Sequence, residues 1–199
     1  MIGKPEIIRI AGQVNLNPHA VEKDYALGWL LAGIFANDKV ADSWVFKGGT
    51  CLKKCFFETY RFSEDLDFTL RDESHLDEAF LKAVFAEVGG WVYEQSGLEM
   101  PMDRQDFDIY DNSRGNKNCV GKISYRGPVS PTAGGWPRIK LDLTADERVV
   151  LRRHIFRYSI PTAMLRTMIS LCKPMPTRKR SAKRSALLRN GPGPAISTV

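Results

Sequence analysis

The sequence contains no long hydrophobic run, and this absence excludes a class of protein at the outset. Nowhere in its 199 residues does an apolar stretch approach the roughly 20 residues that a membrane-spanning helix needs. The first residues also lack the charged and then apolar pattern of a secretory signal. We therefore expect a cytoplasmic protein that does not act in a membrane.

Cysteine and histidine are scarce. Four cysteines in a chain of this length do not suggest a disulfide framework, and Cys51 and Cys55 lie one helical turn apart among bulky apolar residues. Reduced thiols in the core are the expected state. His19, His75 and His154 lie far apart and lack the spacing of metal ligands. A zinc site is therefore not expected.

Acidic residues are absent from Ile160 onwards, where the chain carries eight lysines or arginines and five prolines. The whole chain has a formal net charge of +6, but residues 1–159 hold 21 basic against 23 acidic residues, a net of −2. The tail shows no sustained helical or strand periodicity. We therefore divide the chain into a core of residues 1–159 and a basic, irregular tail of residues 160–199.

Helical patterns occur in three parts of the core. Residues 18–35 carry an apolar stripe, and a second helix is predicted from Thr50, as its cap, to about residue 60, with Leu52 facing inward. Residues 75–96 form a third amphipathic pattern, which the pair Gly89-Gly90 is expected to weaken.

Strand patterns alternate with these helices. They begin at Trp44, at Asp65, around Ile123 and at Arg138. Because these strands do not follow a strict strand-helix-strand rhythm, we expect an α+β fold with a mixed β-sheet flanked by helices. The sequence also predicts a solvated acidic loop, which contains Asp103, Asp106, Asp108 and Asp111.

The segment FKGGTCLKKCFFETYRFSEDLDF, residues 46–68, combines a glycine turn with two carboxylates. Residues i and i+2 of a strand point to one side about 6.6 Å apart, so Asp65 and Asp67 are expected to share a face. Like charges ~4 Å apart repel by about 1 kcal/mol in water and by more near a low-dielectric surface. The pair therefore calls for a cation, and hard carboxylate oxygens suit Mg²⁺.

Asp142, on the exposed side of a later strand, is a third candidate carboxylate. Three carboxylates fit a two-metal site, in which one ion activates an attacking oxygen and the other stabilises a leaving phosphate. Gly48 and Gly49 leave room for a triphosphate near the backbone, at the start of a helix. The basic residues that could neutralise the phosphates are Lys47, Arg61 and Lys122.

Each of these motifs also has a simpler interpretation. Two glycines before a helix are commonly only a turn, and a pair of aspartates on a strand is more often solvated surface. The combination of glycine turn, helix, paired aspartates and a later strand-borne aspartate favours a metal-assisted phosphoryl-transfer site.

Four stretches of the sequence resemble the AbiEii-type nucleotidyltransferase toxins of the polymerase-β-like superfamily. The most specific is KGGT followed by RFSEDLDF, and the others are VEKDY, KISYRGP and PRIKLDLT, which together span most of residues 20–150. The resemblance implies a polymerase-β-type core that transfers a nucleotide from an NTP to an acceptor, which is the 3′ end of tRNA in some relatives. It also implies a toxin–antitoxin or abortive-infection system with a cognate antitoxin.

The resemblance assigns a role to each matching residue. Asp65 and Asp67 would hold Mg²⁺, and Asp142 would complete the acidic set and favour deprotonation of the attacking hydroxyl. The residues that it places around the nucleotide are Gly48, Gly49, Thr50, Arg61, Ser63 and Lys122.

The tail departs from the pattern of the family. Relatives continue into helices with a stretch like EKIRALAER, which this chain lacks. If TRKRSAKRSALLRNGPGPAIST is read from the third base of each codon, suitable codons spell YEEAFGEKIRALAERARPRDLYD. We therefore predict that the sequence leaves the family's frame near Ser159 or Ile160, through a frameshift or a sequencing error, and that the chain could be inactive for this reason. Resequencing the gene tests this prediction. The absence of any reading frame that encodes EKIRALAER would contradict it.

Two other functions stay open at the level of sequence. A small-molecule nucleotidyltransferase, such as an antibiotic-modifying enzyme, would carry the same acidic residues. A non-catalytic nucleic-acid-binding protein would use the basic tail, and its salt-dependent binding would be lost on deletion of residues 160–199.

Overall fold

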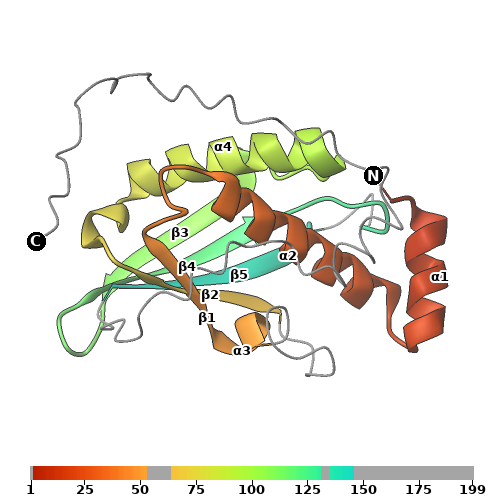
Figure 1. Cartoon of the computed structure of the whole chain (residues 1–199), viewed down its shortest axis with the longest axis horizontal. Helices are drawn as coiled ribbons and strands as arrows, with labels where there is room; N and C mark the ends of the chain where they lie inside the picture. Colours follow the sequence, from red (N-terminus) through yellow and green to blue (C-terminus); the bar gives the residue numbers. More distant parts are fainter. Residues whose placement is uncertain (1, 53–63, 131–134, 146–199) are drawn as a thin grey trace, which may run out of the picture.

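The computed structural model describes residues 2–52, 64–130 and 135–145 (Figure 1). Its helices are α1 (Lys4–Val14), α2 (Pro18–Ala36), α3 (Gly48–Cys51) and α4 (Glu78–Ser96), with short 3-10 turns at Glu73–His75 and Met102–Arg104. Its strands are β1 (Trp44–Lys47), β2 (Asp65–Leu70), β3 (Gln105–Asp111), β4 (Lys117–Ser124) and β5 (Arg138–Thr144).

The five strands form one mixed sheet in the order β1-β2-β5-β4-β3. β2 and β5 pair in parallel, and the other neighbours pair antiparallel. The expected α+β class with a mixed sheet is confirmed. The two strands with the predicted aspartates are the adjacent parallel pair.

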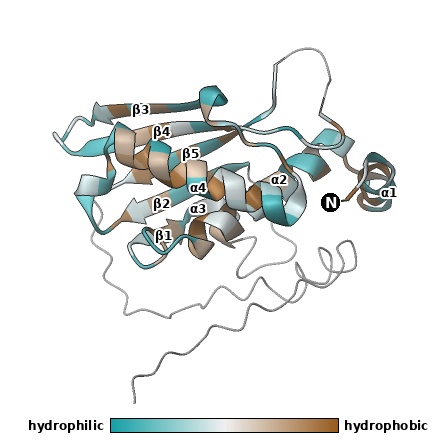
Figure 2. Cartoon of the chain, turned by 90° about the horizontal axis from the view of Figure 1, so that it is seen from above, coloured by the Kyte–Doolittle hydropathy of each residue, from teal (hydrophilic) through white to brown (hydrophobic). Residues whose placement is uncertain are grey.

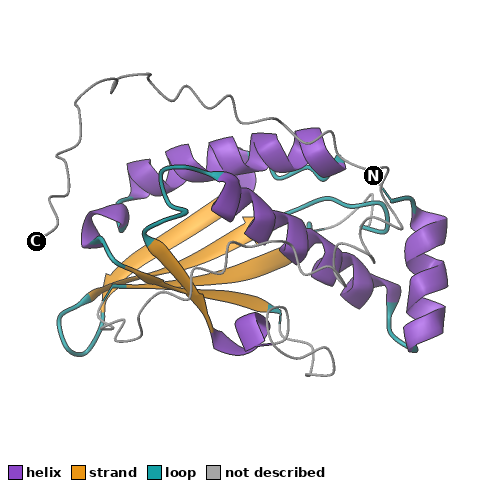
Figure 3. Cartoon of the chain, in the orientation of Figure 1, coloured by secondary structure: helices purple, strands orange, loops and turns teal. Residues whose placement is uncertain are grey.

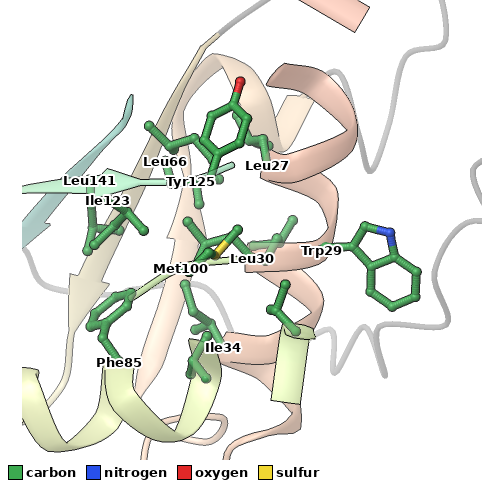
Figure 4. Close-up of a cluster of buried hydrophobic side chains, with 14 of the residues drawn as sticks. Leu27, Trp29, Leu30, Ile34, Leu66, Phe85, Met100, Ile123, Tyr125 and Leu141 are labelled. Carbon is green, nitrogen blue, oxygen red and sulfur yellow. The ribbon is translucent and has the colours of Figure 1, made fainter. Parts of the chain in front are cut away.

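Helices α2 and α4 lie together over one face of the sheet, as Figure 3 shows. In the view from above, α4 runs over the strands (Figure 2). Burial of a large apolar side chain contributes about 1.5–3 kcal/mol, so this layer holds the fold together. The core side chains that meet here include Leu30 and Ile34 of α2, Phe85 of α4, and Leu66, Ile123 and Leu141 of the sheet (Figure 4).

The side chains that alternate with this core point to the other face of the sheet, which we call the polar face. It carries Asp65 and Asp67 of β2 and Lys140 and Asp142 of β5, while Leu66 and Leu141 between them are fully buried. The period-two pattern of the sequence therefore separates core and polar faces as predicted.

Caps fix the helix boundaries. Asn17 caps α2 by accepting a hydrogen bond from the His19 N–H, which agrees with the predicted start at Pro18. The third predicted helix begins at Glu78, not at residue 75, because Asp77 caps it. The glycine pair does not interrupt α4: a Cβ on Gly89 would lie 2.8 Å from the Met100 carbonyl oxygen, so glycine permits a close contact there.

The predicted acidic loop was wrong. Asp106, Asp108 and Asp111 belong to β3, the edge strand of the sheet, and Asp103 lies in the 3-10 turn before it. Exposed charges are common on edge strands, where they discourage pairing with other chains. The buried ring of Phe107 marks the side of β3 that faces the core.

Several predictions fall on residues that the structure does not describe. These are the roles of Arg61 and Ser63, the environment of Cys55 and the nature of the tail. In the described segments, no helix combines the length and apolar character needed to cross a membrane.

Candidate active site

Three carboxylates come together on the polar face. Asp67 of β2 lies directly opposite Asp142 of β5, at the spacing of about 4.8 Å between neighbouring strands. Asp65 lies two residues before Asp67 on the same face, opposite Lys140. The structure thus brings together the aspartates that sequence separates by more than seventy positions.

The surroundings of Asp67 perturb the ionisation of its carboxyl group. Its pKa is raised above the ordinary value, chiefly because partial burial disfavours the charged form and then because of the negative charges of Asp142 and Asp65. Lys47 and Lys140 counteract this effect. Asp67 is therefore repelled by both neighbouring carboxylates in the protein alone, as expected in a set that binds cations.

The raised pKa of Asp67 predicts a pH-dependent stability. Because the pKa of Asp67 is higher in the folded chain, the contribution of this group to stability is full below its ordinary value of 3.8 and is lost as pH rises through the raised pKa. We expect Asp67→Asn to gain stability relative to the wild type over this rise. Urea denaturation in EDTA across the pH range measures the free energy of unfolding of both proteins. A difference between these free energies that does not change with pH would contradict the prediction.

The glycine turn is built around Asp67. Gly48 has a φ of +77°, which residues other than glycine rarely adopt. A Cβ at this position would lie 2.0 Å from Asp67 Oδ2. Glycine is therefore required both by the backbone and by the carboxylate, and the turn and the acidic cluster form one structural unit.

Thr50 does not cap the helix as predicted. Lys47 occupies the N-cap position of α3, and Thr50 lies inside the helix, fully buried. Its hydroxyl donates a 2.6 Å hydrogen bond to the Asp65 carbonyl oxygen, so it ties the glycine turn to β2. Leu52, predicted to face inward, is exposed.

Thr50→Val is therefore expected to destabilise the protein. The change keeps the shape of the side chain but leaves the Asp65 carbonyl without this donor, at a cost of about 1–3 kcal/mol. Chemical denaturation measures the loss, and Thr50→Ser, which keeps the hydroxyl, should retain most of the stability. Equal stability of the valine variant and the wild type would argue against a stabilising hydrogen bond between Thr50 and the Asp65 carbonyl.

Three lysines surround the carboxylates. Lys47 donates a hydrogen bond of 2.9 Å to Thr144 Oγ1, and Lys122 lies 3.6 Å from Asp106, away from the cluster. Lys140 lies between Lys122 and Asp65 in the cross-strand register and donates a 2.8 Å hydrogen bond to Asp142 Oδ2. Sequence reasoning missed Lys140, although its position two residues before Asp142 places it on the same face.

The described residues contain no ready-made group of three acidic, histidine or cysteine side chains that could hold a metal ion. Asp142 is instead paired with Lys140. The donor set nevertheless fits Mg²⁺ in its chemistry, because carboxylate oxygens are its preferred protein ligands and because Asp65 and Asp142 both repel Asp67.

The mixed sheet with α2 and α4 on one face, a glycine turn after its first strand and carboxylates on two adjacent strands is consistent with the core of a nucleotidyltransferase. Residues 29–170, more than half of the chain, match the family model described as nucleotidyl transferase AbiEii toxin, type IV TA system. The chain belongs to this family of nucleotidyltransferase toxins, and membership implies an antitoxin partner. A search of curated proteins found no match.

The family match ends ten residues beyond Ile160, at residue 170. Residues 171–199 therefore lie outside the match, while the first part of the predicted tail lies within it. The change of reading frame near Ser159 or Ile160 stays a prediction.

Proposed function

We propose that this chain is a Mg²⁺-dependent nucleotidyltransferase toxin that transfers a nucleotide from an NTP to an acceptor, with the 3′ end of tRNA as the candidate acceptor. One observation carries the proposal: Asp67 and Asp142 lie side by side on parallel strands, and Asp65 shares their face. Three such carboxylates next to a glycine turn suit the binding of a metal-bound triphosphate. We place the activity in the cytoplasm, together with the antitoxin.

In this proposal Asp65, Asp67 and Asp142 hold Mg²⁺. When bound, the ion would neutralise the charge that develops on the transferred phosphoryl group. Asp142, at the edge of the cluster toward β4, is the group that would hold the proton of the attacking hydroxyl at a carboxylate oxygen.

The nucleotide lies on the glycine turn in this proposal. The lack of a side chain at Gly48 leaves room for the Asp67 carboxylate beside the turn, and buried Thr50 fixes the turn against β2. Gly49 is proposed for the nucleotide-binding turn from the sequence motif. Lys122 and Lys47 lie on the same face as the carboxylates and are the described cations for the phosphates. Arg61 and Ser63 are proposed for the same role from the sequence motif alone.

Labelled NTPs test this function directly. The purified chain is incubated with each of the four α-labelled NTPs, Mg²⁺ and total tRNA, and label in the tRNA is measured with EDTA as control. We expect transfer that EDTA abolishes. The tail departs from the family pattern. If resequencing finds a reading frame that encodes EKIRALAER, the same assay is therefore also run on the protein that the corrected gene encodes.

The alternatives predict different results in this assay. Label that appears only in a small acceptor such as an aminoglycoside would identify a small-molecule nucleotidyltransferase. Absence of transfer by either form of the protein, with salt-dependent RNA binding that is lost on removal of residues 160–199, would identify a binding protein.

A further inference from the structure

We propose that Lys140 is the internal cation of the acidic cluster: its ammonium holds Asp142 in the metal-free protein, must leave when a divalent ion binds, and then becomes available to the nucleotide phosphates. The last step rests on the proposed function, whereas the competition with the metal does not. Nothing in the sequence motifs assigned a role to this lysine.

The position of Lys140 in the sheet supports this role. It lies opposite Asp65 on β2 and opposite Lys122 on β4, and its ammonium nitrogen lies 2.8 Å from Asp142 Oδ2. About half of its side chain is exposed, so the ammonium group can leave Asp142 without breaking core contacts. A long, flexible lysine stem suits a charge that moves.

Lys140 interacts with the whole cluster. Its pKa is raised, first by the hydrogen bond to Asp142 and then by the negative charges of Asp142, Asp65 and Asp67. Lys47 is bonded to Thr144, and Lys122 faces Asp106. Lys140 itself donates its hydrogen bond to Asp142, a carboxylate of the cluster.

A divalent ion held by the same carboxylates would compete with this ammonium. The two cations would attract the same oxygens and repel one another, and the repulsion is twice that between two single charges. The ammonium therefore lowers the apparent affinity for metal while it reduces repulsion among the carboxylates. Its release would place a positive charge beside the turn at which the triphosphate is proposed to bind.

Metal binding by Lys140→Met tests the competition. The variant removes the charge and keeps much of the apolar stem, and Mn²⁺ binding to the full chain is followed by the electron paramagnetic resonance signal of free Mn²⁺. We expect the dissociation constant for Mn²⁺ to fall about tenfold, which corresponds to the loss of one nearby positive charge. In EDTA the variant should be less stable than the wild type, and Mn²⁺ should restore its stability.

Lys82→Met is the matched control. Lys82 also forms an ion pair, 2.6 Å from Glu78, but on the exposed side of α4. This variant should bind Mn²⁺ as the wild type does. Lys140→Arg, which keeps the charge, should also retain the wild-type affinity, and Lys140→Gln supplies a second neutral variant if the methionine variant does not fold.

Unchanged, weaker or absent Mn²⁺ binding in the neutral variants would overturn the role of Lys140. The nucleotidyltransferase assay distinguishes this failure from failure of the proposed function. Tighter Mn²⁺ binding without transfer by any form of the protein would support the competition and reject the enzyme. Transfer with unaltered Mn²⁺ affinity in Lys140→Met would support the enzyme and reject the competition.

Discussion

Asp67→Asn is expected to reduce nucleotide transfer about a thousandfold while the protein stays folded. A carboxylate that holds a metal ion supports several kcal/mol of transition-state stabilisation, and each 1.36 kcal/mol is about tenfold in rate. Asp67 lies centrally in the cluster, between Lys47 of β1 and Asp142 of β5 in the register. The amide keeps the shape of the side chain but not its charge.

Asp108→Asn provides the control for this loss. Asp108 lies in the same cross-strand row, opposite Val120, which in turn lies opposite Asp142. It is therefore an aspartate of the same face at the edge of the sheet, outside the cluster, and its variant should keep wild-type transfer. Transfer that survives in Asp67→Asn, or that is lost equally in both variants, would reject the proposed site. Rates of label transfer and urea denaturation of both variants measure these outcomes.

Gly48→Ala is expected to cause the second large effect, on stability and transfer together. An L-residue in the left-handed region costs about 1–2 kcal/mol. The new methyl group would also lie 2.0 Å from Asp67 Oδ2, so the carboxylate or the turn must move. We expect the free energy of unfolding to fall by more than the backbone cost alone, and transfer to be lost because Asp67 leaves its position.

Gly115→Ala isolates the first of these causes, the backbone cost. Gly115 has a φ of +78°, almost the same as Gly48, but no atom lies within 4 Å of its would-be Cβ. Its variant therefore carries the backbone cost without the collision and should keep its activity. The difference in unfolding free energy between the two variants measures the contact with Asp67. Equal destabilisation of the two proteins, with transfer intact in both, would contradict the proposed coupling of turn and cluster.

The elements that sequence predicted well are those with local signals. α2 begins at a proline after a capping asparagine, and β2 and β5 alternate apolar and charged side chains, so each was found with close to its observed bounds. β3 was missed because its outward side chains are mostly aspartates, a composition typical of loops. Pairing with β4 makes it a strand, and that pairing is not written in the segment itself.

Thr50 shows the same limit within the candidate site. A threonine after two glycines predicts a helix cap, but the cap position falls on Lys47 and the threonine hydroxyl reaches the Asp65 carbonyl, fifteen residues further along the chain. A side chain with two available roles takes the one that the tertiary contact allows. The sequence contains no local signal for that contact.

For this protein, the sequence by itself determined that Asp65 and Asp67 share one side of a strand, because the side-chain alternation of a strand is a property of the backbone. Family membership was likewise readable from the motifs and agrees with the match over residues 29–170. Only the tertiary structure decided that Asp142 lies opposite Asp67 and that the Asp67 carboxylate packs where a side chain at Gly48 would lie. It also decided that Lys140 forms an ion pair with Asp142. These relations depend on the register between strands distant in sequence, which the packing of the shared core sets.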